Sequence, residues 1–259
     1  MEITTLIVLG LVGLLAGGID AIAGGGGLLT LPALLSAGVD PALALGTNKG
    51  QSVFGSFAAL VRYARSPLLD RRRALGGFIA GFCGSVGGVL LVQYVPTTAL
   101  RPLLLVMLLM AAVIVLLVRP RPAGEGSRPL SRPLSRPLSR PLWHWLVVGV
   151  VMGGYDGFFG PGTGTFLIIV GVWWWGRSYE AASADAKAVN CASNLGAVLV
   201  FAWLGLVWWL PALVMASGAL VGGWCGAHLV LTRGQGLVRG LAVTVSLLLA
   251  GKVAWDLWR

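Results

Sequence analysis

The chain has 259 residues, a formal net charge of +10 and a mean hydropathy of +0.86. Only 11% of its residues are charged, whereas a soluble globular domain carries about 25%. This composition excludes a soluble globular protein and predicts an integral membrane protein. Its basic residues lie almost entirely between apolar segments. Membrane topology explains that placement, and we expect no nucleic acid partner.

Apolar segments of membrane-spanning length and two shorter ones follow one another along the chain. A span needs about 20 residues, and eight segments meet this length: 3–22, 41–63, 74–95, 98–118, 143–159, 181–204, 210–231 and 238–257. Segments 28–37 and 164–175 are shorter and follow Gly-rich breaks, as half-helices do. We therefore expect an all-α membrane protein, a polytopic helical bundle of about eight spans plus two half-helices.

A basic, proline-rich segment separates two apolar halves. Residues 119–142 contain four tandem copies of Ser-Arg-Pro-Leu, and a proline at every fourth position prevents a continuous helix. We interpret this segment as a cytoplasmic tether, although a regulatory role for the repeat is the alternative. The expected organisation is a first transmembrane repeat over 1–118, the linker over 119–142, and a second transmembrane repeat over 143–259.

The distribution of arginine predicts the topology of the two halves. Loops 62–73 and 232–239 and the linker are rich in arginine, which places them in the cytoplasm. Loop 205–210 carries no charge and is expected outside. Segment 41–63 then ends inside and segment 181–204 ends outside, so the two repeats are predicted to have inverted topology.

Two parts of the sequence are imperfect copies of one another. Residues 17–27 and 46–49 in the first half correspond to residues 153–164 and 187–190 in the second. Both copies contain paired glycines, an aspartate, a Gly-rich break, and a later asparagine and lysine. A duplicated apolar chain with Gly-broken helices and matched polar residues is typical of a secondary transporter.

The Gly-rich breaks are candidate anion sites. A helix that begins again after a break has unpaired amides and about half a positive charge at its N-terminus. Glycine also lets an anion approach the backbone closely. We therefore include Gly26, Gly27, Gly162 and Thr163 among the candidate substrate-binding residues. Close helix crossing is a structural explanation for the same glycines.

Lysine is rare, which makes its positions informative. The chain has three lysines, and Lys49 and Lys187 occupy equivalent positions beside an asparagine near the start of an apolar segment. A cation at the bilayer centre costs about 2.5–3.5 kcal/mol on insertion scales. Both lysines are therefore candidate substrate-binding residues. The alternative is that their ammonium groups extend to the lipid headgroups.

Polar side chains on the same two segments are further candidates. Asn48 and Ser52 share one helix face, as do Asn190 and Asn194, since each pair is four residues apart. These groups are suited to hydrogen-bonding an oxyanion. They are equally suited to joining helices, which contributes about 0.6 kcal/mol on average.

Asp20 and Asp156 precede the two breaks at matching positions. Three roles stay open for them: proton coupling, counter-charges for the lysines, and caps for the following turn. A different hypothesis makes them the pair of an intramembrane aspartyl protease, which requires two carboxylates close enough to share a proton. Duplication explains their equivalence without that chemistry.

The remaining sequence offers no enzyme motif. Cys83, Cys191 and Cys225 lie in apolar stretches and are expected to be buried free thiols, with no metal site and no cofactor. Glycines at four-residue spacing, such as Gly218 and Gly222, are suited to helix packing. Such faces serve internal packing or a homo-oligomer equally well.

The motifs resemble those of the TauE/SafE family of sulfite exporters. The resemblance lies in Gly24-Gly25-Gly26-Gly27-Leu28-Leu29-Thr30-Leu31-Pro32, Gly46-Thr47-Asn48-Lys49, Gly160-Pro161-Gly162-Thr163-Gly164 and Lys187-Ala188-Val189-Asn190. It covers the chain apart from the linker. It implies a multi-pass permease that transports sulfite or another sulfur-containing or small organic anion across the bacterial inner membrane. Our hypothesis from the residues is a carrier that works by alternating access. An anion channel is the alternative that sequence does not separate from a carrier.

Overall fold

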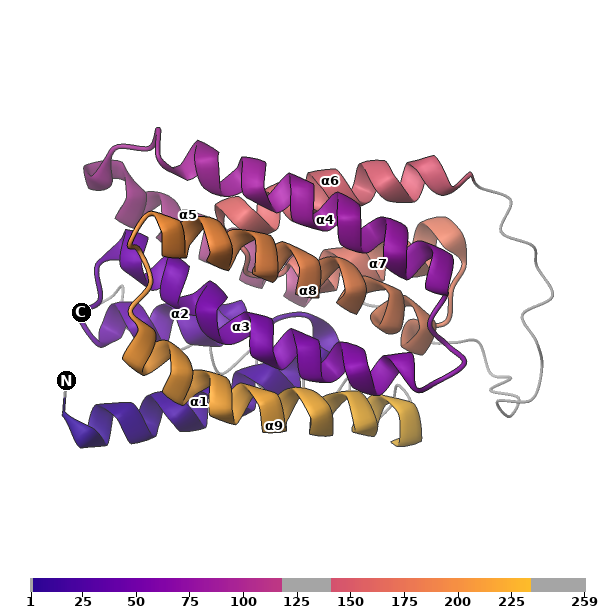
Figure 1. Cartoon of the computed structure of the whole chain (residues 1–259), viewed down its shortest axis with the longest axis horizontal. Helices are drawn as coiled ribbons and strands as arrows, with labels where there is room; N and C mark the ends of the chain where they lie inside the picture. The colour runs from indigo at the N-terminus through magenta and orange to yellow at the C-terminus, as the bar shows by residue number, and fades with distance from the viewer. Residues whose placement is uncertain (1, 118–140, 234–259) are drawn as a thin grey trace.

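The computed structural model describes residues 2–117 and 141–233, and within these ranges its regular structure is entirely helical (Figure 1). The helices are α1 Ile3–Ala23, α2 Gly27–Ser36, α3 Pro41–Ala64, α4 Arg71–Val92, α5 Thr97–Leu117, α6 Leu142–Phe158, α7 Thr163–Trp175, α8 Tyr179–Trp203 and α9 Trp209–Arg233. The expected all-α class is confirmed. The predicted segment 238–257 and nearly all of the linker lie outside the described residues.

The helices differ in how well they suit a bilayer. Among the described helices, α1, α4 and α9 are long and apolar enough to cross a membrane by length and composition. Helices α3 and α8 are also long, with 24 and 25 residues, but they carry the polar site residues. The two predicted half-helices are present as the short helices α2 and α7. The count of eight spans stays a prediction.

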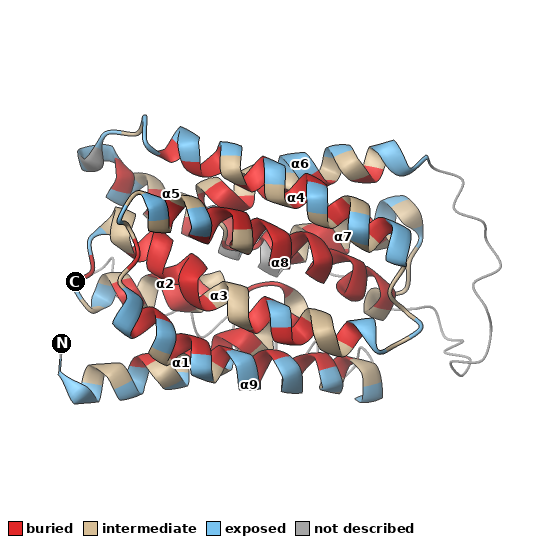
Figure 2. Ribbon diagram, in the orientation of Figure 1, coloured by how far each residue is buried: buried red, intermediate tan, exposed pale blue. Residues whose placement is uncertain are grey.

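Two outer layers of helices enclose a central pair. Helix α1 packs along α9, and α6 packs along α4, while α3 and α8 contact each other between them. In Figure 1, α1, α3 and α9 run from left to right, and α4, α6 and α8 run the opposite way. Figure 2 shows that α8 is buried along most of its length, in keeping with its central place.

Glycines permit the close approach of the outer pairs. A side chain on Gly218 or Gly222 of α9 would collide with the backbone of α1, and one on Gly84 or Gly88 of α4 would collide with the backbone of α6. Small residues at this spacing let helix backbones pack directly against each other. The packing role expected for these glycines is thus confirmed.

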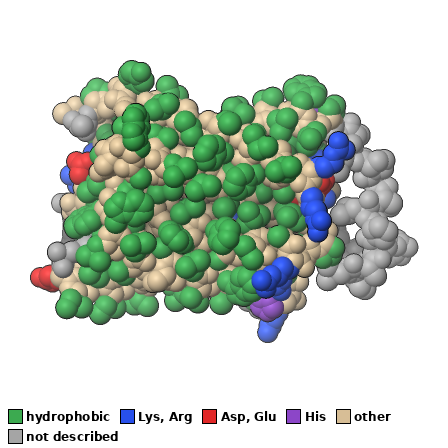
Figure 3. Space-filling model, viewed as in Figure 1, with side chains coloured by type: hydrophobic (Ala, Val, Ile, Leu, Met, Phe, Trp, Pro, Cys, Tyr) green, Lys and Arg blue, Asp and Glu red, His purple; other side chains and the backbone are tan. Residues whose placement is uncertain are grey.

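The surface is apolar along the bundle and basic at one end. Figure 3 shows hydrophobic side chains covering the length of this face, with Lys and Arg gathered at the right. Exposed arginines at this end include Arg65 directly after α3, Arg71 at the start of α4 and Arg233 at the end of α9. Cys83 and Cys225 are exposed on the bundle, so the expectation that they are buried was wrong, while Cys191 is buried. A thiol is apolar enough to face lipid tails.

Candidate functional site

The chain breaks twice inside the bundle, and glycine makes both breaks. Helix α1 ends at Ala23, where Gly24 adopts a left-handed conformation with φ of 76°. After α6, Gly160 and Gly162 have φ values of 102° and 88° before α7 begins at Thr163. Only glycine adopts such angles without steric cost, which explains why the two helices stop where they do.

The two breaks meet each other in space. A Cβ atom on Gly24 would collide with the backbone of Gly164, and one on Gly27 would lie 3.2 Å from the Cα of Pro161. The N-terminal ends of α2 and α7 therefore start from one shared region in the middle of the bundle. The structure thus brings the two candidate anion sites together.

Two ion pairs cross between the halves of the chain. Lys49 Nζ on α3 lies 2.8 Å from Asp156 Oδ1 on α6, and Lys187 Nζ on α8 lies 2.8 Å from Asp20 Oδ2 on α1. Each lysine thus neutralises the aspartate that precedes the break in the other half. Both lysine side chains are buried, so the alternative in which they extend to lipid headgroups was wrong.

Lys187 is held by α1 and by its own helix. Its ammonium group donates to the backbone oxygen of Asp20 at 2.6 Å, to Asp20 Oδ2 at 2.8 Å and to Asn190 Oδ1 at 3.3 Å. Lys187 and Asn190 thus lie on the same face of α8. The ammonium therefore lies at the last turn of α1, directly before the first break.

Lys49 has the equivalent place at the second break. Besides Asp156, its ammonium donates to Asn194 Oδ1 at 3.2 Å, and it lies so near Gly160 that a Cβ there would be 2.7 Å from Nζ. Ser193 Oγ donates to Asp156 Oδ2. Ser193 was not among the predicted residues, although it lies three positions after Asn190 and therefore near the same helix face.

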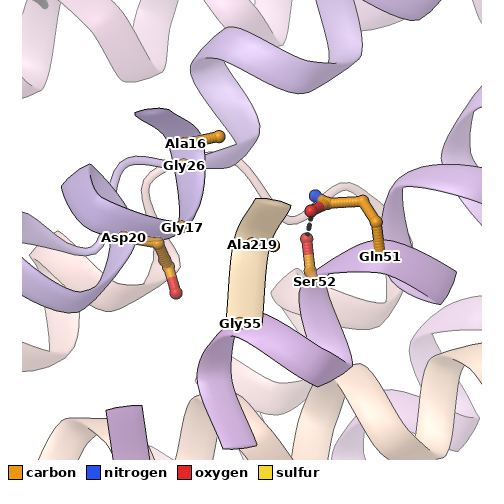
Figure 4. Close-up of a pocket in the computed structure, with 8 residues that line it drawn as sticks. All are labelled: Ala16, Gly17, Asp20, Gly26, Gln51, Ser52, Gly55 and Ala219. Carbon is orange, nitrogen blue, oxygen red and sulfur yellow. Dashed lines mark hydrogen bonds between the residues drawn. The ribbon is translucent and has the colours of Figure 1, made fainter. Parts of the chain in front are cut away.

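A small pocket lies beside the first break (Figure 4). It is lined by Ala16, Gly17, Asp20, Gly26, Gln51, Ser52, Gly55 and Ala219. Asp20, Gly26 and Ser52 were predicted as site residues. Gln51 was missed, because one polar residue between two others on a helix gives no periodic signal.

Hydrogen bonds fix the α3 wall of this pocket. Gln51 Nε2 donates to Asn48 Oδ1 at 3.2 Å and to Ser52 Oγ at 2.7 Å. Asn48 Oδ1 also accepts a hydrogen bond from Thr30 Oγ1 of α2. Asn48 therefore ties the half-helix α2 to α3, and Gln51 and Ser52 present the polar surface of the pocket.

Some predicted residues lie elsewhere. Gly27 packs against Pro161 and is not a lining residue of this pocket, and neither are Gly162 and Thr163 at the start of α7. Thr163 Oγ1 donates to Gly160 O at 2.7 Å, which stabilises the second break itself. These residues shape the breaks, and their contact with a substrate stays a prediction.

A third charged cluster links the loops at the basic end. Asp185 Oδ2 lies 3.0 Å from Arg177 Nη2 and 4.0 Å from Arg73 Nη1, and Asp185 Oδ1 accepts from the Asp70 amide at 3.1 Å. Arg177 Nη2 also donates to Leu68 O at 2.9 Å. Sequence reasoning gave Asp185 no partner, because Arg73 and Asp70 lie more than 100 positions from it in the chain.

The aspartyl protease hypothesis finds no support in this arrangement. Asp20 and Asp156 each have their own lysine within 2.8 Å. Two carboxylates that act as a protease dyad must share one proton between them. Here each carboxylate instead has a separate cationic partner.

Comparison with known proteins gives consistent matches over nearly the whole chain. The model of the family "Sulfite exporter TauE/SafE" matches residues 9–253. The "probable membrane transporter protein YfcA" of Escherichia coli K12 is 40% identical over 249 residues, which cover 96% of this chain and 89% of that protein. A "probable membrane transporter protein" of Haemophilus influenzae is 37% identical over 98% of this chain and 96% of its own length. No solved structure matches the chain.

Proposed function

The chain belongs to the TauE/SafE family of bacterial multi-pass membrane transporters, and from this premise we propose that it carries a small anion by alternating access. The substrate class that we propose is a sulfur-containing oxyanion or organosulfonate such as sulfite. The name of the family model supports this choice, and the chain supplies the cationic and hydrogen-bonding groups that an oxyanion needs.

The observation that carries the proposal is the meeting of two Gly-rich breaks with two buried lysines. Lys49 and Lys187 are each about 1% exposed, at the edges of breaks that start α2 and α7. Helix N-termini and ammonium groups both favour negative charge. A buried cation in a membrane helix is costly and usually marks a pathway for an ion or substrate.

We further propose that 1–118 and 143–259 are two inverted repeats. Corresponding helices run in opposite directions, as α1 and α6 do in Figure 1. Their contacts also correspond, because α1 packs on α9 as α6 packs on α4. Halves related in this way support alternating access, since rocking one against the other opens a shared site to each side of the membrane in turn.

Thermal unfolding of the purified protein with candidate anions tests the proposal. Sulfite, thiosulfate, sulfoacetate, sulfate and acetate form the panel. A ligand that binds only the folded state at about 100 times its Kd raises stability by about 2.7 kcal/mol. We expect stabilisation by a sulfur-containing anion and its loss in Lys187→Met. A protein that no anion stabilises would contradict the proposal, and unchanged binding by Lys187→Met would remove Lys187 from the site.

A further inference from the structure

The two crossed ion pairs have different surroundings. The side chains of Lys49 and Asp156 are both 2% exposed. Lys187 is 1% exposed, but its partner Asp20 is 17% exposed and lines the pocket of Figure 4. One pair is therefore sealed inside the protein, and the carboxylate of the other opens onto a space beside the first break.

The hydrogen bonds differ in the same direction. Asp156 accepts from Ser193 in addition to its contact with Lys49, and Lys49 also donates to Asn194. The carboxylate of Asp20 is bound by Lys187 alone among the side-chain hydrogen bonds of the described residues. Protonation of Asp156 would disturb its contacts with both Lys49 and Ser193 inside a closed environment. Protonation of Asp20 would release only Lys187.

The pocket as it stands combines attractive and repulsive groups for an anion. The N-terminus of α2 at Gly26 and the hydroxyl group of Ser52 are suited to an oxyanion, and Gln51 orients that hydroxyl group. The ionised carboxylate of Asp20 repels it, and this carboxylate also occupies the ammonium group of Lys187. An anion that enters must therefore compete with Asp20 for Lys187.

Building on the proposed function, we propose that Asp20 is the residue that couples a proton to anion binding. A proton from water binds the Asp20 carboxylate, which then becomes a neutral acid and gives up its ion pair. Lys187 keeps its positive charge and pairs with the incoming anion. With one proton taken up, a monoanion adds no net charge to the site, and a dianion adds one negative charge instead of two. Proton uptake thus lowers the charge that is buried in the membrane.

The groups around this pair allow such an exchange. The hydroxyl groups of Tyr63 on α3 and Tyr179 on α8 donate to backbone oxygens of α1, at 2.9 and 2.8 Å. Cys191 of α8 is buried near the pair. Helices α7 and α9 present uncharged residues here, such as Thr165 and Ala219. Among the described residues, Lys187 is thus the cation within ion-pair distance of Asp20.

Calorimetric titration in two buffers of different ionisation enthalpy tests the coupling, because it counts the protons taken up with each anion. Thiosulfate, sulfoacetate and methanesulfonate are the probes, since each keeps its charge between about pH 6 and about pH 8. For the unaltered protein we expect uptake of about one proton per bound anion. Anion affinity should fall about tenfold for each unit by which the pH rises, over the range in which binding takes up this proton. In Asp20→Asn we expect no proton uptake on anion binding and an anion affinity that does not depend on pH.

Asp20→Ala serves as a second variant without the carboxylate if Asp20→Asn does not fold. Asp40→Asn is the matched control, because Asp40 is an exposed cap of α3 whose side chain accepts from the Ala42 amide at 3.0 Å. The Asp40→Asn variant should take up a proton on anion binding, as the unaltered protein does. Anion binding without proton uptake, or uptake that persists in either Asp20 variant, would overturn the coupling and leave the proposed function standing. If no probe and no anion of the panel binds the unaltered protein, the proposed function fails and the coupling fails with it.

Discussion

The ammonium nitrogen of Lys49 and a carboxylate oxygen of Asp156 meet 2.8 Å apart, although the two residues belong to opposite halves of the chain. Each half therefore contributes an aspartate whose charge the other half neutralises. A buried charge without its partner is strongly unfavourable in a membrane protein. The crossed pairs thus make correct assembly of the two halves a condition for burying either set of charges.

Asp156→Asn is expected to destabilise the protein because it leaves Lys49 buried without its counter-charge. Removing one partner of a buried pair costs about 3–5 kcal/mol, whereas replacing both by apolar residues is often nearly neutral. We therefore expect Lys49→Met with Asp156→Leu to recover much of the stability lost in Asp156→Asn. Chemical unfolding in detergent measures both variants, with the exposed cap variant Asp40→Asn as control. A single variant as stable as the control would contradict the importance of this pair.

Gly24→Ala tests the contact between the two breaks. Gly24 has φ of +76° and a Cβ there would collide with Gly164, whereas Gly38 has φ of +78° and nothing within 4 Å of its Cβ position. Both substitutions strain the backbone by about 1 kcal/mol. Gly24→Ala should lower the free energy of unfolding by about 1–3 kcal/mol more than Gly38→Ala. The backbones at Gly24 and Gly164 cannot move apart without disturbing the packing around them. Equal unfolding free energies for Gly24→Ala and Gly38→Ala would show that the breaks do not depend on this contact.

Much of the fold could be predicted because its signals are local. Apolar segment length predicted the helices, and glycine runs predicted where α1 and α6 stop. The matched Lys and Asp positions identified the residues that form the crossed pairs. Which lysine pairs with which aspartate could not be predicted, since duplication makes both choices equivalent in sequence and only the packing of α3 and α8 between the outer layers selects one.

The polar details of the site were less predictable. Gln51 lines the pocket, but nothing in its spacing distinguishes it from a residue that joins helices. Asp185 pairs with Arg73 of α4 and with Arg177 in the loop directly before α8. Such contacts arise from tertiary packing, and a pattern within one helix does not contain them.

Asp185→Asn is expected to loosen the basic end of the bundle. It removes the negative charge between Arg73 and Arg177 and leaves two largely buried guanidinium groups close together. The free energy of unfolding should fall by about 3–5 kcal/mol, as it does when one partner of a buried ion pair is removed in other proteins. Because Asp185 also accepts from the Asp70 amide, we expect faster proteolysis within loop 65–70. Limited proteolysis of the detergent-solubilised protein measures this, and unaltered cleavage rates would contradict the link.

Gln51→Leu tests the polar wall of the pocket while keeping the side-chain volume similar. Gln51 is buried and donates to Ser52 Oγ at 2.7 Å, so its removal frees that hydroxyl from its fixed orientation. A hydrogen bond of this kind contributes about 0.5–1.5 kcal/mol, and we expect anion affinity to fall about tenfold or less. Gln93→Leu is the control, since Gln93 is exposed after the end of α4. Calorimetric titration of both variants with the tightest anion of the panel measures the effect, and an affinity equal to that of Gln93→Leu would mean that the anion does not use this wall.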